Sequence, residues 1–69
     1  MEDFAERLLE LRKEKGLGQV ALAKETGLSK AAIAHWELGH RVPLATYVII
    51  LAKYFGVTTD YLLGLSDYK

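Results

Sequence analysis

The sequence contains no cysteine, a single proline, no long apolar run and no excess of either charge. Without cysteine the chain forms no disulfide, offers no thiolate nucleophile and cannot hold zinc through sulfur ligands. One proline in 69 residues argues against a disordered tail. The longest apolar run covers residues 47–52, whereas a membrane-spanning helix needs about 20 residues. With no recognisable signal peptide, these absences predict a soluble cytoplasmic protein with no membrane partner.

The charge balance is neutral, because nine basic and nine acidic residues cancel. Proteins that bind nucleic acid draw much of their affinity from Lys and Arg on phosphates, and a basic excess would have supported that function. Neutrality of the whole chain still allows one basic face, since charges of opposite sign can segregate between surfaces. The total charge therefore gives DNA binding no support of its own.

Residues 19–38 are the most informative stretch, and they predict two short helices joined by a tight turn. Gly27 permits the left-handed backbone that such a turn requires. The small side chain of Ala23 lets a second helix approach, and Ser29 suits the start of that helix. Two short helices that cross at a glycine turn form a helix-turn-helix, whose second helix can enter the major groove of DNA.

Residues from about 4 to 65 resemble the helix-turn-helix domain of the phage repressor and Cro type, known as the XRE family. The residues that carry this resemblance are LR at 11–12, Gln19, LA at 22–23, Gly27, Leu28, Ser29, Ile33, WE at 36–37, Gly39, Pro43, LAKYFGV at 51–57 and DYLLG at 60–64. The resemblance implies an all-α, five-helix bundle that contains a helix-turn-helix. A chain of this length has room for one such domain, over residues 1–69.

The local patterns place the helices at about 3–15, 19–26, 30–38 and 44–54, with a short last helix between Thr58 and Gly64. Asp3 is expected to be the N-cap of the first helix, and residues 65–69 are expected to form a loose tail. Apolar residues at helical spacing predict the core, namely Phe4, Leu8, Leu11, Val48, Leu51, Ala52 and Phe55.

The resemblance implies that DNA contacts come from the start of the second helix, from the exposed face of the third helix and from the loop that follows. The predicted contact residues are Gln19, Ser29, Lys30, Ala31, Ala34, His35 and Arg41. Gln19 is expected to touch phosphate and to support the third helix, whose exposed side chains would contact the bases. Lys30 and His35 can donate to guanine or to phosphate, whereas Ala31 and Ala34 offer only apolar contact with a thymine methyl. Ser29 is better explained as the N-cap of the third helix.

The resemblance also implies a largely buried ion pair between Arg12 and Glu37, which would join the first helix to the end of the third. A buried pair roughly balances its own desolvation, so its role would be to set helix orientation. The alternative is two solvated charges that never meet.

Neither a metal site nor a catalytic site emerges from the sequence. His35 and His40 lie five residues apart, but no third or fourth ligand is evident within one chain, although a symmetric dimer could supply them. No Ser or Thr stands at a spacing that suggests an adjacent base, and no glycine-rich phosphate loop is present. The chain is therefore expected to be no enzyme, with no cofactor and no small-molecule substrate.

Apolar residues occupy many positions that are most often polar in the family: Leu9, Val20, Ala21, Ala31, Ala32, Ala34, Leu38, Val42, Leu44, Tyr47 and Ile50. Leu44, Tyr47 and Ile50 recur at i, i+3 and i+6, which predicts a second apolar stripe that could bind a protein. Scattered exposed apolar residues are also normal in a small domain.

Two functions remain open. The first is a sequence-specific transcriptional regulator that binds a palindromic operator in double-stranded DNA as a homodimer. The second is a repressor-fold scaffold, with a surface altered by evolution or by design, that serves as a protein-interaction or self-assembly module with weak or no DNA binding.

Overall fold

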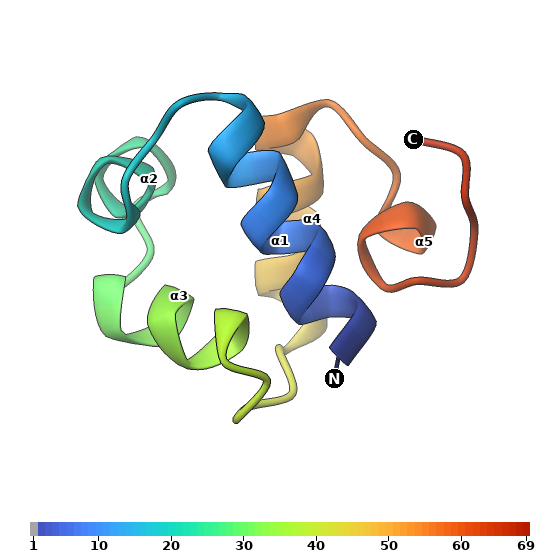
Figure 1. Cartoon of the computed structure of the whole chain (residues 1–69), viewed down its shortest axis with the longest axis horizontal. Helices are drawn as coiled ribbons and strands as arrows, with labels where there is room; N and C mark the ends of the chain where they lie inside the picture. The colour runs from blue at the N-terminus through green and yellow to red at the C-terminus, as the bar shows by residue number, and fades with distance from the viewer. Residues whose placement is uncertain (1) are drawn as a thin grey trace.

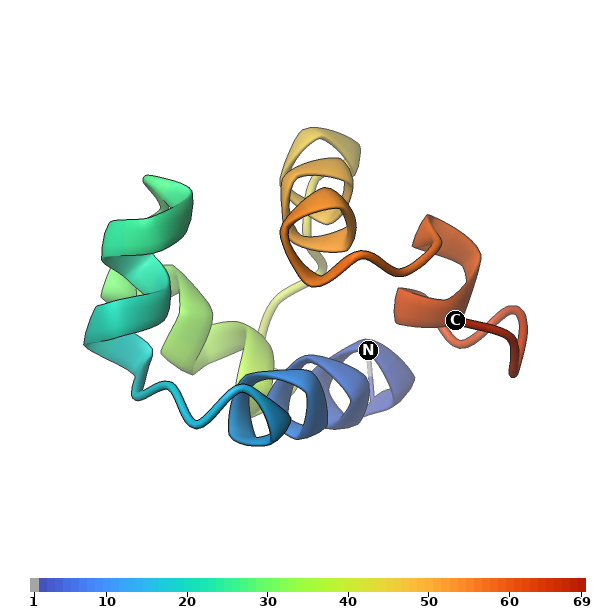
Figure 2. The same ribbon diagram turned by 90° about the horizontal axis from the view of Figure 1, so that it is seen from above.

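A computed structural model describes residues 2–69, which form five α-helices and no strand. The helices are α1 Glu2–Glu14, α2 Gln19–Thr26, α3 Lys30–Glu37, α4 Ala45–Phe55 and α5 Thr59–Leu62. Figure 1 shows α2 and α3 on one side of α1, and α5 with the C-terminal segment on the other. Seen from above, α1 and α4 face each other across the middle of the molecule (Figure 2). Within residues 2–69 no helix combines the length and apolar character that crossing a membrane requires.

The core draws at least one fully buried side chain from every helix. The largest of these side chains are Phe4, Leu8, Leu22, Ile33, Leu51 and Leu62. The ring of Phe4 meets that of Trp36 edge to face, with 6.1 Å between the centroids. Within residues 3–69, every fully buried residue of the core is apolar. This single apolar cluster confirms the all-α helix-turn-helix bundle that the sequence predicted.

The observed helix ends follow the predicted ones to within one residue in most places. The first helix differs at its start, because α1 already includes Glu2 and Asp3 therefore lies inside the helix. The prediction of Asp3 as the N-cap was wrong. The structure places Asp3 against Gly64 instead, where a Cβ atom added to the glycine would collide with the Asp3 side chain. Contact with a distant glycine is invisible to a pattern that considers only neighbouring residues.

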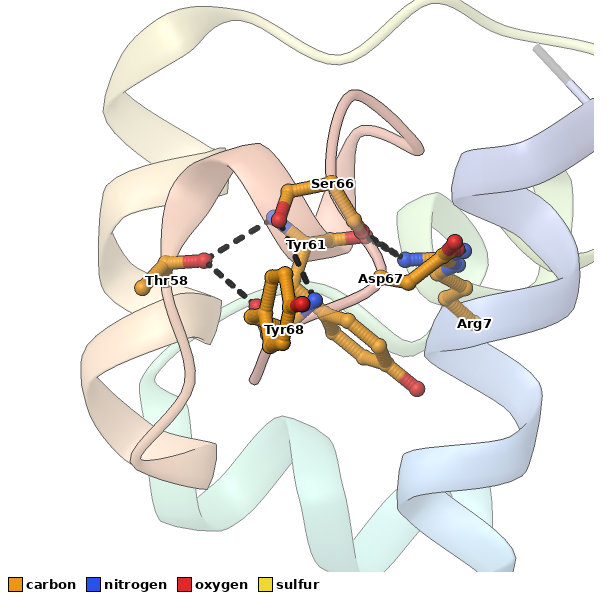
Figure 3. A network of polar contacts seen from close by, with 6 residues as sticks. All are labelled: Arg7, Thr58, Tyr61, Ser66, Asp67 and Tyr68. Carbon is orange, nitrogen blue, oxygen red and sulfur yellow. Dashed lines mark hydrogen bonds and ion pairs between the residues drawn. The ribbon is translucent and has the colours of Figure 1, made fainter.

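The C-terminal segment 65–69 lies along α5 and touches α1, in contrast to the loose tail expected from the sequence. Arg7 of α1 donates to the carbonyl of Ser66 and forms an ion pair with Asp67 at 3.1 Å (Figure 3). At the other end of α5, the hydroxyl of Thr58 donates to the carbonyl of Tyr68 at 3.3 Å. The segment is therefore held by contacts about 55–60 residues away in sequence as well as by local ones.

Candidate nucleic-acid interface

The turn between α2 and α3 is built from local hydrogen bonds. Gly27 adopts a left-handed conformation with φ of 74°, and its N–H donates to the carbonyl of Ala23 at 2.9 Å. The hydroxyl of Ser29 accepts the N–H of Ala32 at 3.0 Å, which caps the first turn of α3. The buried side chains of Leu22 and Ile33 complete the packing of the two helices. The structure thus gives Ser29 the capping role that the sequence analysis favoured.

A network of charged and polar side chains connects the end of α3 to α1 and to the start of α2. Arg12 forms a two-pronged contact with Glu37, from Nε to Oε2 at 2.7 Å and from Nη2 to Oε1 at 2.9 Å. Arg12 Nη1 also donates to the carbonyl of Leu17 at 2.8 Å. Gln19, at the start of α2, donates from Nε2 to Glu37 Oε1 at 3.0 Å. The carboxylate of Glu37 therefore joins α1, α2 and α3 at one point.

This network is shielded from water, since the side chains of Arg12 and Glu37 are only 13% and 6% exposed. The hydrogen bond with Glu37 raises the pKa of Arg12, which desolvation by burial opposes and the negative charge of Glu37 reinforces. Arg12 accordingly stays charged at every ordinary pH. The pair therefore fixes the orientation of α3 relative to α1 and α2.

The predicted DNA-contact residues of α3 lie on its more accessible side. Lys30 and Ala31 are exposed in its first turn, and Ala34 and His35 follow half-buried. Arg41 is exposed in the loop after α3. Among the side chains described for residues 3–69, neither Lys30 nor Arg41 makes a side-chain hydrogen bond or an ion pair. Two cationic groups are therefore available to an anionic ligand on this side of the molecule.

The two histidines lie near each other, with 6.1 Å between the ring centroids of His35 and His40. Among the described residues, no three or more His, Cys, Asp or Glu side chains are grouped to hold a metal ion. His35 lies on the same side of α3 as Ala34 and Ala31.

A hollow of about 460 Å³ lies between α3 and the start of α4. Ser29, Arg41, Leu44 and Tyr47 are among its lining residues. Tyr47 also packs on Trp36, with 5.5 Å between the ring centroids. Leu44 and Tyr47, two members of the predicted apolar stripe, thus belong to a surface that borders α3.

A second hollow, of about 470 Å³, separates α4 from α5 and has mainly apolar walls. Its lining residues are Val42, Pro43, Ala45, Val48, Ile49, Thr59 and Leu63. Ile49 is 46% exposed, whereas Ile50 of the predicted stripe is half-buried and lines neither hollow. The sequence analysis missed Ile49. Its place one residue after core residue Val48, in a run of apolar residues, hides it from a periodicity argument.

Comparison with known proteins identifies the framework. The HTH_3 family model, described as helix-turn-helix, matches residues 2–62. The HTH-type transcriptional activator BcrR of Enterococcus faecalis is 39% identical over 62 residues, which are 90% of this chain and 30% of that protein. The uncharacterized HTH-type transcriptional regulator YobD of Bacillus subtilis is 34% identical over 64 residues, which are 93% of this chain and 57% of that protein.

Two solved structures share the fold. The restriction-modification controller protein C.AhdI of Aeromonas hydrophila superposes with a TM-score of 0.80 at 33% identity, covering 88% of this chain and 92% of that one. An HTH_3 family transcriptional regulator from Vibrio cholerae gives a TM-score of 0.81 at 28% identity, over 91% of this chain and 35% of that one. The chain spans from about a third to just over half of the curated relatives described above.

Proposed function

This chain belongs to the HTH_3 helix-turn-helix family of DNA-binding transcriptional regulators, and we propose that it binds double-stranded DNA with α3 in the major groove. One observation carries the proposal. The Arg12–Glu37–Gln19 network fixes the end of α3 to α1 and α2, while the side chains of Lys30 and Arg41 have no hydrogen-bond or ion-pair partner among the side chains described for residues 3–69. A rigidly held helix with unpaired cations beside it is suited to phosphate and base-edge contacts.

The proposed contacts divide by chemistry. Lys30 donates to guanine O6 and N7 or to phosphate, and Arg41 meets the sugar-phosphate backbone. The Nε2 group of Gln19 donates one N–H to Glu37, so its second N–H is the one that can donate to a phosphate. Ala31 and Ala34 contact thymine methyl groups, and His35 donates to guanine or phosphate. Because only a few groups read bases, sequence-dependent DNA shape contributes a large share of the specificity.

We also infer a homodimer on a palindromic operator, acting in the cytoplasm. The second hollow, between α4 and α5, supports this arrangement. Its walls are apolar, and exposed Val42 and Ile49 lie at its surface. Contiguous exposed apolar surface of this kind favours a protein partner. A second copy that packs there would leave the reading residues Lys30 and Ala31 of both chains uncovered.

Fluorescence anisotropy with a random-sequence duplex pool tests DNA binding, at low salt and then at higher salt. Lys30→Ala and Arg41→Ala should each weaken binding and reduce the salt slope by about one unit. Lys53→Ala, in the last turn of α4, is the matched control and should leave binding unchanged. Equal binding by all three variants would contradict the contact assignment.

Sedimentation tests the homodimer. Ile49→Asp should give monomers, because it places a charge in the apolar hollow between α4 and α5. Leu44→Asp adds the same charge at the exposed N-cap of α4, beside the first hollow, and should leave the dimer intact. The opposite pattern would move the interface to the surface of Leu44 and Tyr47.

A protein-interaction module is the second candidate, because four apolar residues in α2, at the end of α3 and in the segment before α4 are exposed. They are Val20, Leu38, Val42 and Leu44. Absence of DNA binding even at low salt, together with self-association that Leu44→Asp abolishes, would favour this module over the regulator.

A further inference from the structure

Arg7 is the centre of a polar cluster that joins α1, α5 and the segment 65–69, which we call the strap (Figure 3). Its Nη1 donates to the carbonyls of Tyr61 at 2.7 Å and Ser66 at 2.5 Å. Its Nη2 lies 3.1 Å from Asp67 Oδ1, and its guanidinium carbon stands 4.2 Å from the centroid of the Tyr61 ring. Arg7 thus satisfies one backbone carbonyl of α5 and one of the strap, and it stacks on the aromatic ring of Tyr61 in α5.

Thr58 ties the strap to the opposite end of α5. Its hydroxyl accepts the N–H of Tyr61 at 3.0 Å and donates to the carbonyl of Tyr68 at 3.3 Å (Figure 3). The N–H of Tyr68 in turn donates to the hydroxyl of Ser66 at 3.1 Å. The strap therefore connects the start of α5 with its end through side chains outside the core.

The helix α5 depends on these contacts, because it is too short to be stable by itself. α5 has four residues, a single turn, and helices this short are unstable in isolation. Leu62 anchors it in the core, and Gly64 presses closely against Asp3 of α1. Its remaining side, Thr59 and Leu63, forms one wall of the hollow between α4 and α5. A change in the position of α5 would change the shape of that wall.

We propose that Arg7 and the strap are positioning elements for the α4–α5 surface through which two chains associate. This inference rests on the proposed homodimer, and it deepens that proposal by assigning a role to residues far from the interface. Loss of the Arg7 contacts leaves two carbonyls of α5 and the strap without their donor, so α5 moves and Leu63 no longer fits the partner chain. The dimer dissociation constant should rise on the order of tenfold.

Sedimentation equilibrium on Arg7→Met, which keeps the apolar stem and removes every donor, tests the proposal. Arg7→Lys keeps the charge but lacks the planar fork, and should give an intermediate dissociation constant. Glu10→Gln is the matched control, because Glu10 is an exposed charge on the same helix α1 and takes no part in the Arg7 cluster. Circular dichroism and the fluorescence of Trp36 verify that each variant is folded.

Methyl NMR in an Ile49→Asp background reports the position of α5 in the monomer. Arg7→Met should shift the resonances of Leu63 and Thr59 while those of Leu22 stay in place. A wild-type dimer that Arg7→Met leaves equally tight would overturn the positioning role alone. A wild-type chain that stays monomeric would remove the homodimer and this inference with it. Should Arg7→Met fail to fold, Arg7→Lys decides by the same comparison.

Discussion

Removal of either partner of the Arg12–Glu37 pair should destabilise the fold far more than removal of one partner of an exposed ion pair. With side chains only 13% and 6% exposed, neither partner can recover its solvation when the other is removed. Arg12→Met would leave the Glu37 carboxylate with Gln19 alone, and Glu37→Leu would leave the guanidinium with the Leu17 carbonyl alone. Each single substitution should cost about 3–5 kcal/mol of unfolding free energy.

That loss is large for this chain, since a domain of 69 residues has a total stability of roughly 3–10 kcal/mol. The double variant Arg12→Met/Glu37→Leu leaves no unpaired charge, and should lose much less than the sum of the two singles. Urea unfolding followed by circular dichroism and by the single tryptophan, Trp36, measures all four proteins.

The exposed pair Lys69–Glu14 provides the control. Its atoms lie 3.4 Å apart on side chains that are more than half exposed, so Lys69→Met should change stability by less than about 1 kcal/mol. Single variants of the Arg12–Glu37 pair that lose less than about 1 kcal/mol would refute the view of a dry, mutually dependent pair. Losses that simply add in the double variant would refute the coupling.

The same pair should make no pH-dependent contribution through Arg12. Its pKa is raised in the folded state, so its stabilisation is complete below its unfolded pKa and is lost only as the pH rises through the folded one. Both values lie above the ordinary range. The difference in unfolding free energy between wild type and Arg12→Met should therefore lack any Arg12 titration from about pH 6 to about pH 10.

Three further substitutions test local features by urea unfolding. Gly18→Ser should stabilise by a few tenths of a kcal/mol, because Gly18 is the N-cap of α2, has extended backbone and leaves open space for a side chain; any loss would contradict the capping argument. Ser29→Ala should cost about 1 kcal/mol through its lost cap, and an unchanged midpoint would count against it. Gly64→Ala should cost about 1–3 kcal/mol or more, since φ is 81° and the new methyl group would strike Asp3; neutrality would show that α5 can shift freely.

The helix boundaries, including those of α3, were largely predictable because the signals for them are local. Gly27 ends α2 and Ser29 starts α3 through bonds that span at most four residues. The pairing of Arg12 with Glu37 was expected only from the family resemblance, and the structure contains it. Which of the predicted contact residues on α2, on α3 and in the following loop touch DNA stays a prediction, because a contact residue is defined by its ligand.

Arg7 shows why other features escaped the sequence. It lies at helical spacing between core residues Phe4 and Leu11, a register that points a side chain inward, and that was the one available signal. Its partners, however, are carbonyls 54 and 59 residues away. No pattern of residue types encodes a bond to a distant backbone carbonyl, since every residue has one.

The sequence by itself determined the helices, the glycine turn and the apolar residues that make one small core, because hydrogen bonds and periodicity within a few residues specify them. Only the tertiary structure decided that Ile49 rather than Ile50 faces solvent, that Tyr47 packs on Trp36, and that the strap binds α5 through Arg7. Those outcomes depend on the angles at which helices pack. The packing angles result from all buried side chains together, so they cannot be predicted from any single stretch of the sequence.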